Sequence, residues 1–283
     1  MVLKMKRTNN RWFFILPSLV GMLLFYFAPG FISIRYAFTG PQGQFVGFAN
    51  VADVFGNFTF RLAAQNSLRF IAYSVPLNML FSFLLAGLLQ GLKHKKILAI
   101  VFMLPLIIPS GAVVFFWNTL FADNGAINSL LFRFGRETVP WLMSDRSFFV
   151  ILLVFLFRNI GFNMVLFLSG FQLIPSYYYE VAQVEGARPI QTLRHITLIY
   201  LMPTSFLVFM MSIINSFRIF REIYLLYGPY PHQSVYMLQH FMNNQFLFSN
   251  MQRLSVTAAS ISIVTVIFVW GIFTGQRKFS DAF

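Results

Sequence analysis

Few side chains in this sequence have the types and spacing needed for acid–base or metal chemistry. The 283 residues include 8 acidic residues and 4 histidines, and no cysteine. Without cysteine there can be no disulfide, thiolate metal site or iron–sulfur cluster. The histidines, at positions 94, 195, 232 and 240, lack metal-ligand spacing. No phosphate-binding Gly-x-x-x-x-Gly-Lys-Ser/Thr loop is present, so ATP must be hydrolysed elsewhere if it is used. We therefore predict no catalytic residue, metal or cofactor on this chain.

One basic residue, Arg158, lies in the middle of a long apolar stretch, next to Asn159. Asn159 and Asn163 are one helical turn apart, so these two residues and Arg158 can form a polar stripe. If the stretch crosses a membrane, a bare charge there costs about 2.5–3.5 kcal/mol, so Arg158 should not face lipid. These side chains could form the wall of a pathway for a polar solute. Alternatively, Arg158 could anchor its helix to a neighbour, or lie near the outer end of a shifted span. Asn215 and Ser216 are weaker pathway candidates, more typical of packing between helices.

The composition around these residues is that of an integral membrane protein. Hydrophobic residues make up 58% and charged residues 10%, whereas soluble domains carry about 25% charged residues. Charge-poor stretches long enough to cross about 30 Å of hydrocarbon predict six helices. They lie at about 12–34, 70–92, 97–120, 148–171, 196–217 and 254–276. The first should be broken or bent near Pro29-Gly30. We predict an all-α, multi-pass protein of the cell membrane, forming a single domain over residues 1–283.

The distribution of lysine and arginine predicts the orientation in the membrane. The net charge is +13, and most of the excess basic residues lie at the ends of spans, where they mark the cytoplasmic side of a bilayer. This placement argues against a nucleic-acid partner. Both termini and the loop 176–194 are then cytoplasmic, and longer loops at 38–69, 121–146 and 218–253 lie outside. The residues that set this orientation are Lys4, Lys6, Arg7, Arg11, Lys93, Lys95, Lys96, Arg277 and Lys278.

The loop 176–194 has the local signals of two short helices joined by a turn. Ser176 is a candidate N-cap, and residues 177–185 can form two or three helical turns. Gly186 suits the left-handed position after a helix, and Pro189 suits the first turn of a second helix. Such a knob could fit a groove in a soluble partner, or it could rest on lipid headgroups. The local signals favour neither interpretation.

The same loop resembles the EAA motif of binding-protein-dependent ABC importer permeases. The resemblance is carried by Glu180-Val181-Ala182, Gly186-Ala187 and Ile196-Thr197-Leu198, after a Gly170-to-Pro175 segment similar to that of the carbohydrate subclass. Val181 replaces the middle alanine of the motif. The overall pattern is most similar to the maltose and glycerol-3-phosphate type. Further matches extend along the chain, at 45–50, 104–109, 124–128, 140–142 and 216–224.

This resemblance implies a type I importer permease with six helices, a transport subunit and not an enzyme. The implied partners are a second permease, two ATPases that bind ATP and magnesium, and an extracytoplasmic solute-binding protein. The implied role of the loop 176–194 is coupling to an ATPase. Its implied contact residues are Glu180, Val181, Ala182, Glu185, Gly186 and Ala187.

Two departures from the family pattern and several alternatives remain. Ile199 stands where the family usually has proline, which predicts a straighter start of the fifth span, and Arg221 stands where it often has aspartate. A sugar or related polar solute is the expected cargo. A permease for a non-sugar solute is the main alternative, and an ion-coupled secondary transporter is a further one. A membrane-embedded enzyme is disfavoured, because the clean spans contain no Asp, Glu or Lys.

Overall fold

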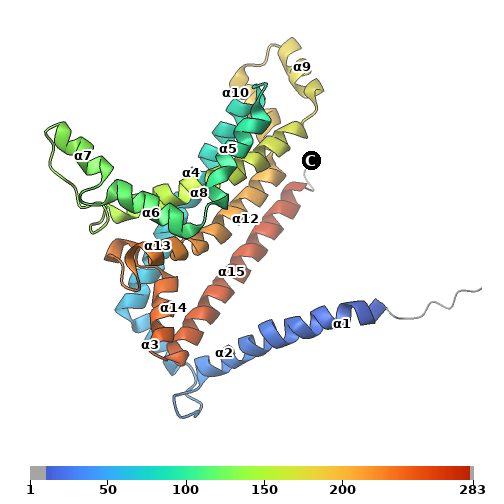
Figure 1. Ribbon diagram of the computed structural model, residues 1–283. Coiled ribbons are helices and arrows are strands. Elements are labelled where there is room, and N and C mark those ends of the chain that lie inside the picture. Colours follow the sequence, from blue (N-terminus) through green and yellow to red (C-terminus); the bar gives the residue numbers. More distant parts are fainter. Residues whose placement is uncertain (1–10, 281–283) are drawn as a thin grey trace, which may run out of the picture. The chain divides into compact units, whose positions relative to one another are not determined.

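The computed structural model describes residues 11–280, and this part of the chain is almost wholly helical (Figure 1). The predicted all-α fold is confirmed. Three of the basic residues behind the predicted orientation, Lys4, Lys6 and Arg7, lie outside the described residues, and the sidedness of the termini stays a prediction. The longer elements are α1 (Arg11–Met22), α2 (Ala28–Phe38), α3 (Ala49–Gly56), α4 (Phe58–Gln90), α5 (Lys95–Ile107), α6 (Ser110–Phe121), α7 (Ala126–Arg133), α8 (Ser147–Gln172), α9 (Ser176–Val184), α12 (Met202–Arg218), α13 (Phe220–Tyr227), α14 (Leu238–Leu247) and α15 (Met251–Ser280).

The chain divides into two compact units. One comprises Met1–Asn57 with Asn244–Trp270, and the other comprises Phe58–Asn243 with Gly271–Phe283. The prediction of one permease domain over the whole chain is not tested by this division.

The first unit contains the N-terminal apolar helix, which is long enough to cross a membrane over Ile15–Phe38. Its irregularity is a π-helical turn, η1 (Leu23–Phe27), directly before Pro29. A proline ring clashes with the carbonyl four residues earlier in a regular α-helix, and the wider turn relieves that clash. The break predicted near Pro29-Gly30 thus takes the form of a wider turn placed just ahead of the proline.

The second unit is built on α4 and α8, which pack against each other, with α5 and α12 alongside them. Two apolar clusters fill this unit. One centres on Phe70, Ile151 and Phe155, and the other on Ala86, Met164 and Phe167. Helix α4 begins at Phe58, well before the predicted residue 70, because the region predicted as an outside loop is itself helical. The other two predicted outside loops are also partly helical, through α7, α13 and α14.

The third predicted span, 97–120, is not one continuous helix. Helices α5 and α6 are separated at Ile108 and Pro109, and the two parts meet at 92°. Ile108 is extended, with φ −63° and ψ 130°. The residue before a proline avoids the α-helical region because the proline ring crowds its backbone. In the described residues, five helices are long and apolar enough to cross a membrane, or six if this bent pair is one span.

The start of the fifth predicted span is also irregular, so the straighter start inferred from Ile199 was wrong. A π-helical turn, η2 (Leu193–Thr197), leads into a three-residue helix, α11 (Leu198–Tyr200), and the chain turns again at Leu201. Pro203 then lies in the first turn of α12, where its missing N–H needs no partner. The proline at the start of α12, Pro203, thus lies four residues after Ile199.

Candidate functional site

The loop after α8 forms a short helix, α9, that begins one residue earlier than the sequence indicated. Pro175 is the extended residue before the helix, with φ −61° and ψ 132°, and no side chain caps the first turn. Ser176 is therefore the first residue of α9, and its prediction as an N-cap was wrong. Pro175 fixes the change of direction by its ring, so a side-chain cap is not needed to begin the helix.

Gly186 ends α9 in the way the sequence predicted. Its φ is +72°, in the left-handed region where glycine lacks the steric penalty of a side chain. The N–H of Ala187 donates to the carbonyl of Ala182 at 2.9 Å, and the N–H of Gly186 donates to that of Gln183 at 3.1 Å. This pair of bonds is a Schellman motif, which satisfies the last carbonyls of the helix. The turn is thus fixed by bonds that reach no more than five residues along the chain.

The chain after the turn is held by its own local bonds and by two contacts with α9. In α10 (Pro189–Thr192), the side chain of Gln191 accepts from the Arg188 N–H at 2.7 Å. The hydroxyls of Tyr179 and Thr197 lie 3.1 Å apart, and the rings of Tyr178 and Tyr200 have their centroids 5.0 Å apart. These contacts connect the loop to the first turns of the following span.

The six residues predicted to contact an ATPase differ in exposure. Glu180, Glu185 and Gly186 are exposed, Val181 and Ala187 are half-buried, and Ala182 is buried. The two carboxylates are therefore accessible to a partner, whereas Ala182 packs inward. Their contact with an ATPase stays a prediction.

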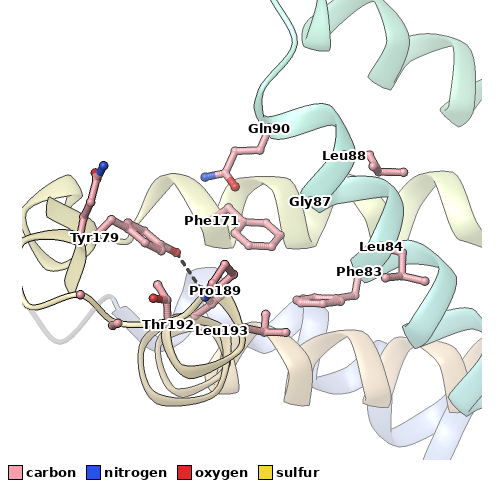
Figure 2. Close-up of a pocket in the computed structure, with 14 residues that line it drawn as sticks. Phe83, Leu84, Gly87, Leu88, Gln90, Phe171, Tyr179, Pro189, Thr192 and Leu193 are labelled. Carbon is pink, nitrogen blue, oxygen red and sulfur yellow. Dashed lines mark hydrogen bonds between the residues drawn. The ribbon is translucent and has the colours of Figure 1, made fainter.

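A cavity of about 880 Å³ lies beside this loop. Its walls come from the last turns of α4, from Phe171 on α8 and from the α9–α10 region. Figure 2 shows Tyr179 and Thr192 at one side of the cavity and Phe83, Leu84 and Leu88 at the other. This cavity could not be predicted from the sequence, because its walls come from three separate stretches of the chain.

Arg158 is ion-paired within the second unit. Its Nη1 donates to Glu222 Oε1 at 2.8 Å and to Ser110 Oγ at 2.9 Å, and Ser110 Oγ donates to the same carboxylate oxygen at 2.8 Å. The side chains of Arg158 and Glu222 are 16% and 8% exposed. This contact connects α8 to α13 and to the first residue of α6. It provides the bonds expected of an anchor between helices, and a role for Arg158 in a solute pathway stays a prediction.

The other predicted pathway residues do not form one polar stripe with Arg158. Asn159 donates to the Phe155 carbonyl of its own helix at 2.8 Å, and Ser216 donates to the Ile213 carbonyl at 2.6 Å. Asn163 instead donates to Ser212 Oγ at 2.9 Å. Asn215 is half-buried. The predicted residues are therefore distributed among several environments within the helices.

A buried polar cluster that the sequence analysis missed surrounds Asn163. Ser212 Oγ on α12 accepts from Asn163 and also from Asn78 on α4, the latter at 3.1 Å, and all three side chains are fully buried. Ser82, one turn after Asn78, donates to the Ile160 carbonyl at 3.1 Å. A signal was present, because Ser74, Asn78 and Ser82 recur every four residues in an apolar helix. Glu222 was also missed, although a lone arginine in a span calls for an acid nearby.

Comparison with known proteins places the chain among membrane transport proteins. Residues 78–276 match the family described as "Binding-protein-dependent transport system inner membrane component". The chain is 31% identical to the probable ABC transporter permease protein YesP of Bacillus subtilis over 75% of this chain and 72% of that protein. It is 28% identical to the trehalose/maltose transport system permease protein MalF of Thermococcus litoralis, over 81% and 80%. A chain in the crystal structure of a bacterial ABC transporter involved in alginate import has the same fold, with a TM-score of 0.83, 22% identity and 94% coverage of both chains.

Proposed function

The chain belongs to the family of binding-protein-dependent transport system inner membrane components, and on this premise we propose that it forms half of the pathway of an ATP-driven sugar importer. Membership in the family makes it a multi-pass transport subunit of the membrane and not an enzyme. The solute, the mechanism and the partner chains are the proposal. It rests mainly on the exposed helix α9, which displays Glu180 and Glu185 and is stopped sharply at Gly186.

In this proposal α9 and α10 fit a groove in a separate ATPase, with Glu180 contacting a basic residue of that partner. ATP and magnesium are bound and ATP is hydrolysed there, because this chain has no phosphate-binding loop. When the ATPases close, α9 moves as a lever. The Tyr179–Thr197 and Tyr178–Tyr200 contacts carry this movement into the span that begins at η2. The spans then rock between inward-open and outward-open arrangements, which is alternating access.

The proposed cargo is a sugar or related polar solute delivered by an extracytoplasmic binding protein. The family description supports the binding protein, and the similarity to the trehalose/maltose transport system permease supports the sugar. A second permease would supply the other half of the pathway. A permease for a non-sugar solute remains the second candidate, since aromatic and amide side chains serve several polar cargoes. The alternative of an ion-coupled transporter was supported only by the charge of Arg158 within a span, and this charge is paired with Glu222.

The test is co-purification from membranes in mild detergent, comparing the tagged chain with its Glu180→Arg variant. We expect a second permease and an ATPase to be recovered with the unaltered chain. Charge reversal should reduce recovery of the ATPase while leaving the second permease bound. Glu137→Arg is the matched control, since Glu137 is exposed in a loop predicted to lie on the opposite side. Recovery of the chain without an ATPase, together with solute uptake that persists after ATP depletion, would refute the proposal.

A further inference from the structure

The cavity beside the loop 176–194 has a chemically mixed lining. Phe83, Leu84, Leu88 and Phe171 form the apolar part of this lining, while Gln90, Gln183 and Thr192 supply polar groups. Its volume of about 880 Å³ is within the range of small-ligand sites, about 300–1,000 Å³. A ligand that fits must therefore carry both an apolar portion and a polar portion.

The apolar part of the cavity continues onto an exposed face of α4. Leu80, Leu84 and Leu88 recur every four residues, so they lie on one side of the helix. All three are between 48% and 71% exposed, although Leu84 and Leu88 also line the cavity. Because α4 is long and apolar enough to cross a membrane, this row of leucines can lie along lipid chains. The cavity thus opens onto the side of a membrane-spanning helix.

Basic residues lie close in the sequence to the residues that line the cavity, although none of the lining residues is itself charged. Three lysines follow the lining residue Gln90 within six positions, and two arginines adjoin the lining residues Ala187, Pro189 and Leu193. The acidic residues in the same region are Glu180 on α9 and Glu185 directly after it, so the basic residues outnumber the acidic ones by five to two. The basic residues are Lys93, Lys95, Lys96, Arg188 and Arg194. This excess of positive charge near the cavity favours a negatively charged group.

We propose that the cavity binds an anionic phospholipid of the surrounding membrane. One acyl chain lies along Leu84 and Leu88, and the phosphate group lies near Lys93 and Arg188. Clusters of lysine and arginine at a membrane surface attract anionic lipids in this way. A lipid is favoured over a protein segment because the leucine row continues along a span. The proposal needs the membrane location that the family establishes, and it does not depend on the identity of the solute.

A bound lipid would connect two elements that the proposed transport cycle moves. Gly87 and Leu88 are on α4, whereas Ala187 and Pro189 follow the Gly186 turn, and a lipid in the cavity would contact both groups. The position of the coupling loop would then depend on the charge of the membrane lipids. This regulatory consequence rests on the proposed function, whereas lipid binding itself does not.

The experiment uses the full chain with its co-purifying subunits, reconstituted in lipid discs that contain a photoactivatable phosphatidylglycerol or phosphatidylcholine probe. After illumination, mass spectrometry identifies the labelled peptides. We expect phosphatidylglycerol to label residues 83–90 and 187–193 about tenfold more than phosphatidylcholine does. Gly87→Leu should abolish most of this labelling, because the nearest atom to an added Cβ is Phe171 Cζ at 4.0 Å and the rest of the side chain enters the cavity.

Gly91→Leu is the matched control, because Gly91 is one turn further on, has open space around it and does not line the cavity. Labelling of the Gly91→Leu variant should equal that of the unaltered chain. A Lys93→Gln/Arg188→Gln variant should lose the preference for phosphatidylglycerol. Equal labelling by both probes, or labelling that Gly87→Leu leaves intact, would overturn the proposal, as would cross-linking of an ATPase into the cavity of the unaltered chain. Recovery of the ATPase in the same preparations reports separately on the proposed function.

Discussion

The coupling loop and the buried polar contacts of the spans use polar groups in opposite ways. In the loop, the bonds that fix the backbone are local, and the carboxylates of Glu180 and Glu185 are left exposed. In the spans, Arg158 and Glu222 neutralise each other, although 64 residues separate them. Asn78 and Ser212 are bonded across 134 residues. The loop leaves its carboxylates exposed, whereas the spans pair their charged groups in the interior.

This difference shows which polar residues to test for function and which to test for stability. Changing an exposed loop residue should affect transport while the protein stays folded. Removing one member of a buried pair should affect folding first, because the remaining polar group has no water to replace its partner.

Glu222→Ala should cause the largest loss of stability, about 3–5 kcal/mol, because it leaves the Arg158 guanidinium buried without its counter-charge. The thermal unfolding midpoint of the purified chain in mild detergent measures this loss. Glu137→Ala is the exposed control and should change little. Replacing both Arg158 and Glu222 by methionine should recover much of the stability. If that double variant also takes up solute normally, Arg158 is an anchor only; if it assembles but does not transport, Arg158 belongs to the pathway.

Gly186→Val should reduce transport about tenfold or more while the protein remains in the membrane. A β-branched residue in the left-handed region costs about 1–3 kcal/mol, so the turn after α9 will shift. Gly186→Asn is the control, because asparagine tolerates this conformation. Uptake is measured relative to the amount of protein in membranes. Normal uptake by the valine variant would mean that the geometry of this loop does not couple transport.

Ser212→Ala should destabilise the chain by about 0.6–1.7 kcal/mol, since both Asn78 and Asn163 then lose their acceptor. Ser169→Ala is a matched control on an exposed face of α8, where the serine bonds only to its own helix. The thermal unfolding midpoints of the Ser212→Ala and Ser169→Ala variants measure this difference. Equal effects would show that the buried cluster contributes no more than an exposed serine does.

Arg253→Gln should have the smallest effect, about 0.2–1 kcal/mol, because its ion pair with Asp53 is partly exposed to solvent. The hydrogen bond from Arg253 holds the pKa of Asp53 below its ordinary value. The pair therefore contributes fully above the ordinary carboxyl pKa, and its contribution is lost as pH falls through the lowered pKa of the folded state. Unfolding midpoints of both proteins should converge on acidification. A difference that persists in acid would exclude this ion pair as its cause.

The coupling loop was largely predictable from the sequence because its structure depends on near neighbours. Gly186 adopts the left-handed conformation that ends α9, and Pro189 is the first residue of α10. The same local rules misjudged Ser176, because Pro175 already sets the direction of the chain. They also do not reveal the break at Ile108 and Pro109 between α5 and α6, or the irregular turns before α12, because hydrophobicity alone represents both stretches as continuous.

The sequence by itself determined that this is a helical membrane protein with a loop whose short helix ends at Gly186, because hydrophobic length and backbone preference act over a few residues at a time. Only the tertiary structure decided the partners of the buried polar groups and the shape of the cavity beside α9. The bonds from Arg158 to Glu222 and Ser110, and from Asn163 to Ser212, join helices far apart in the chain. In an apolar interior a polar side chain must find a partner, but the packing of the helices decides which one it reaches.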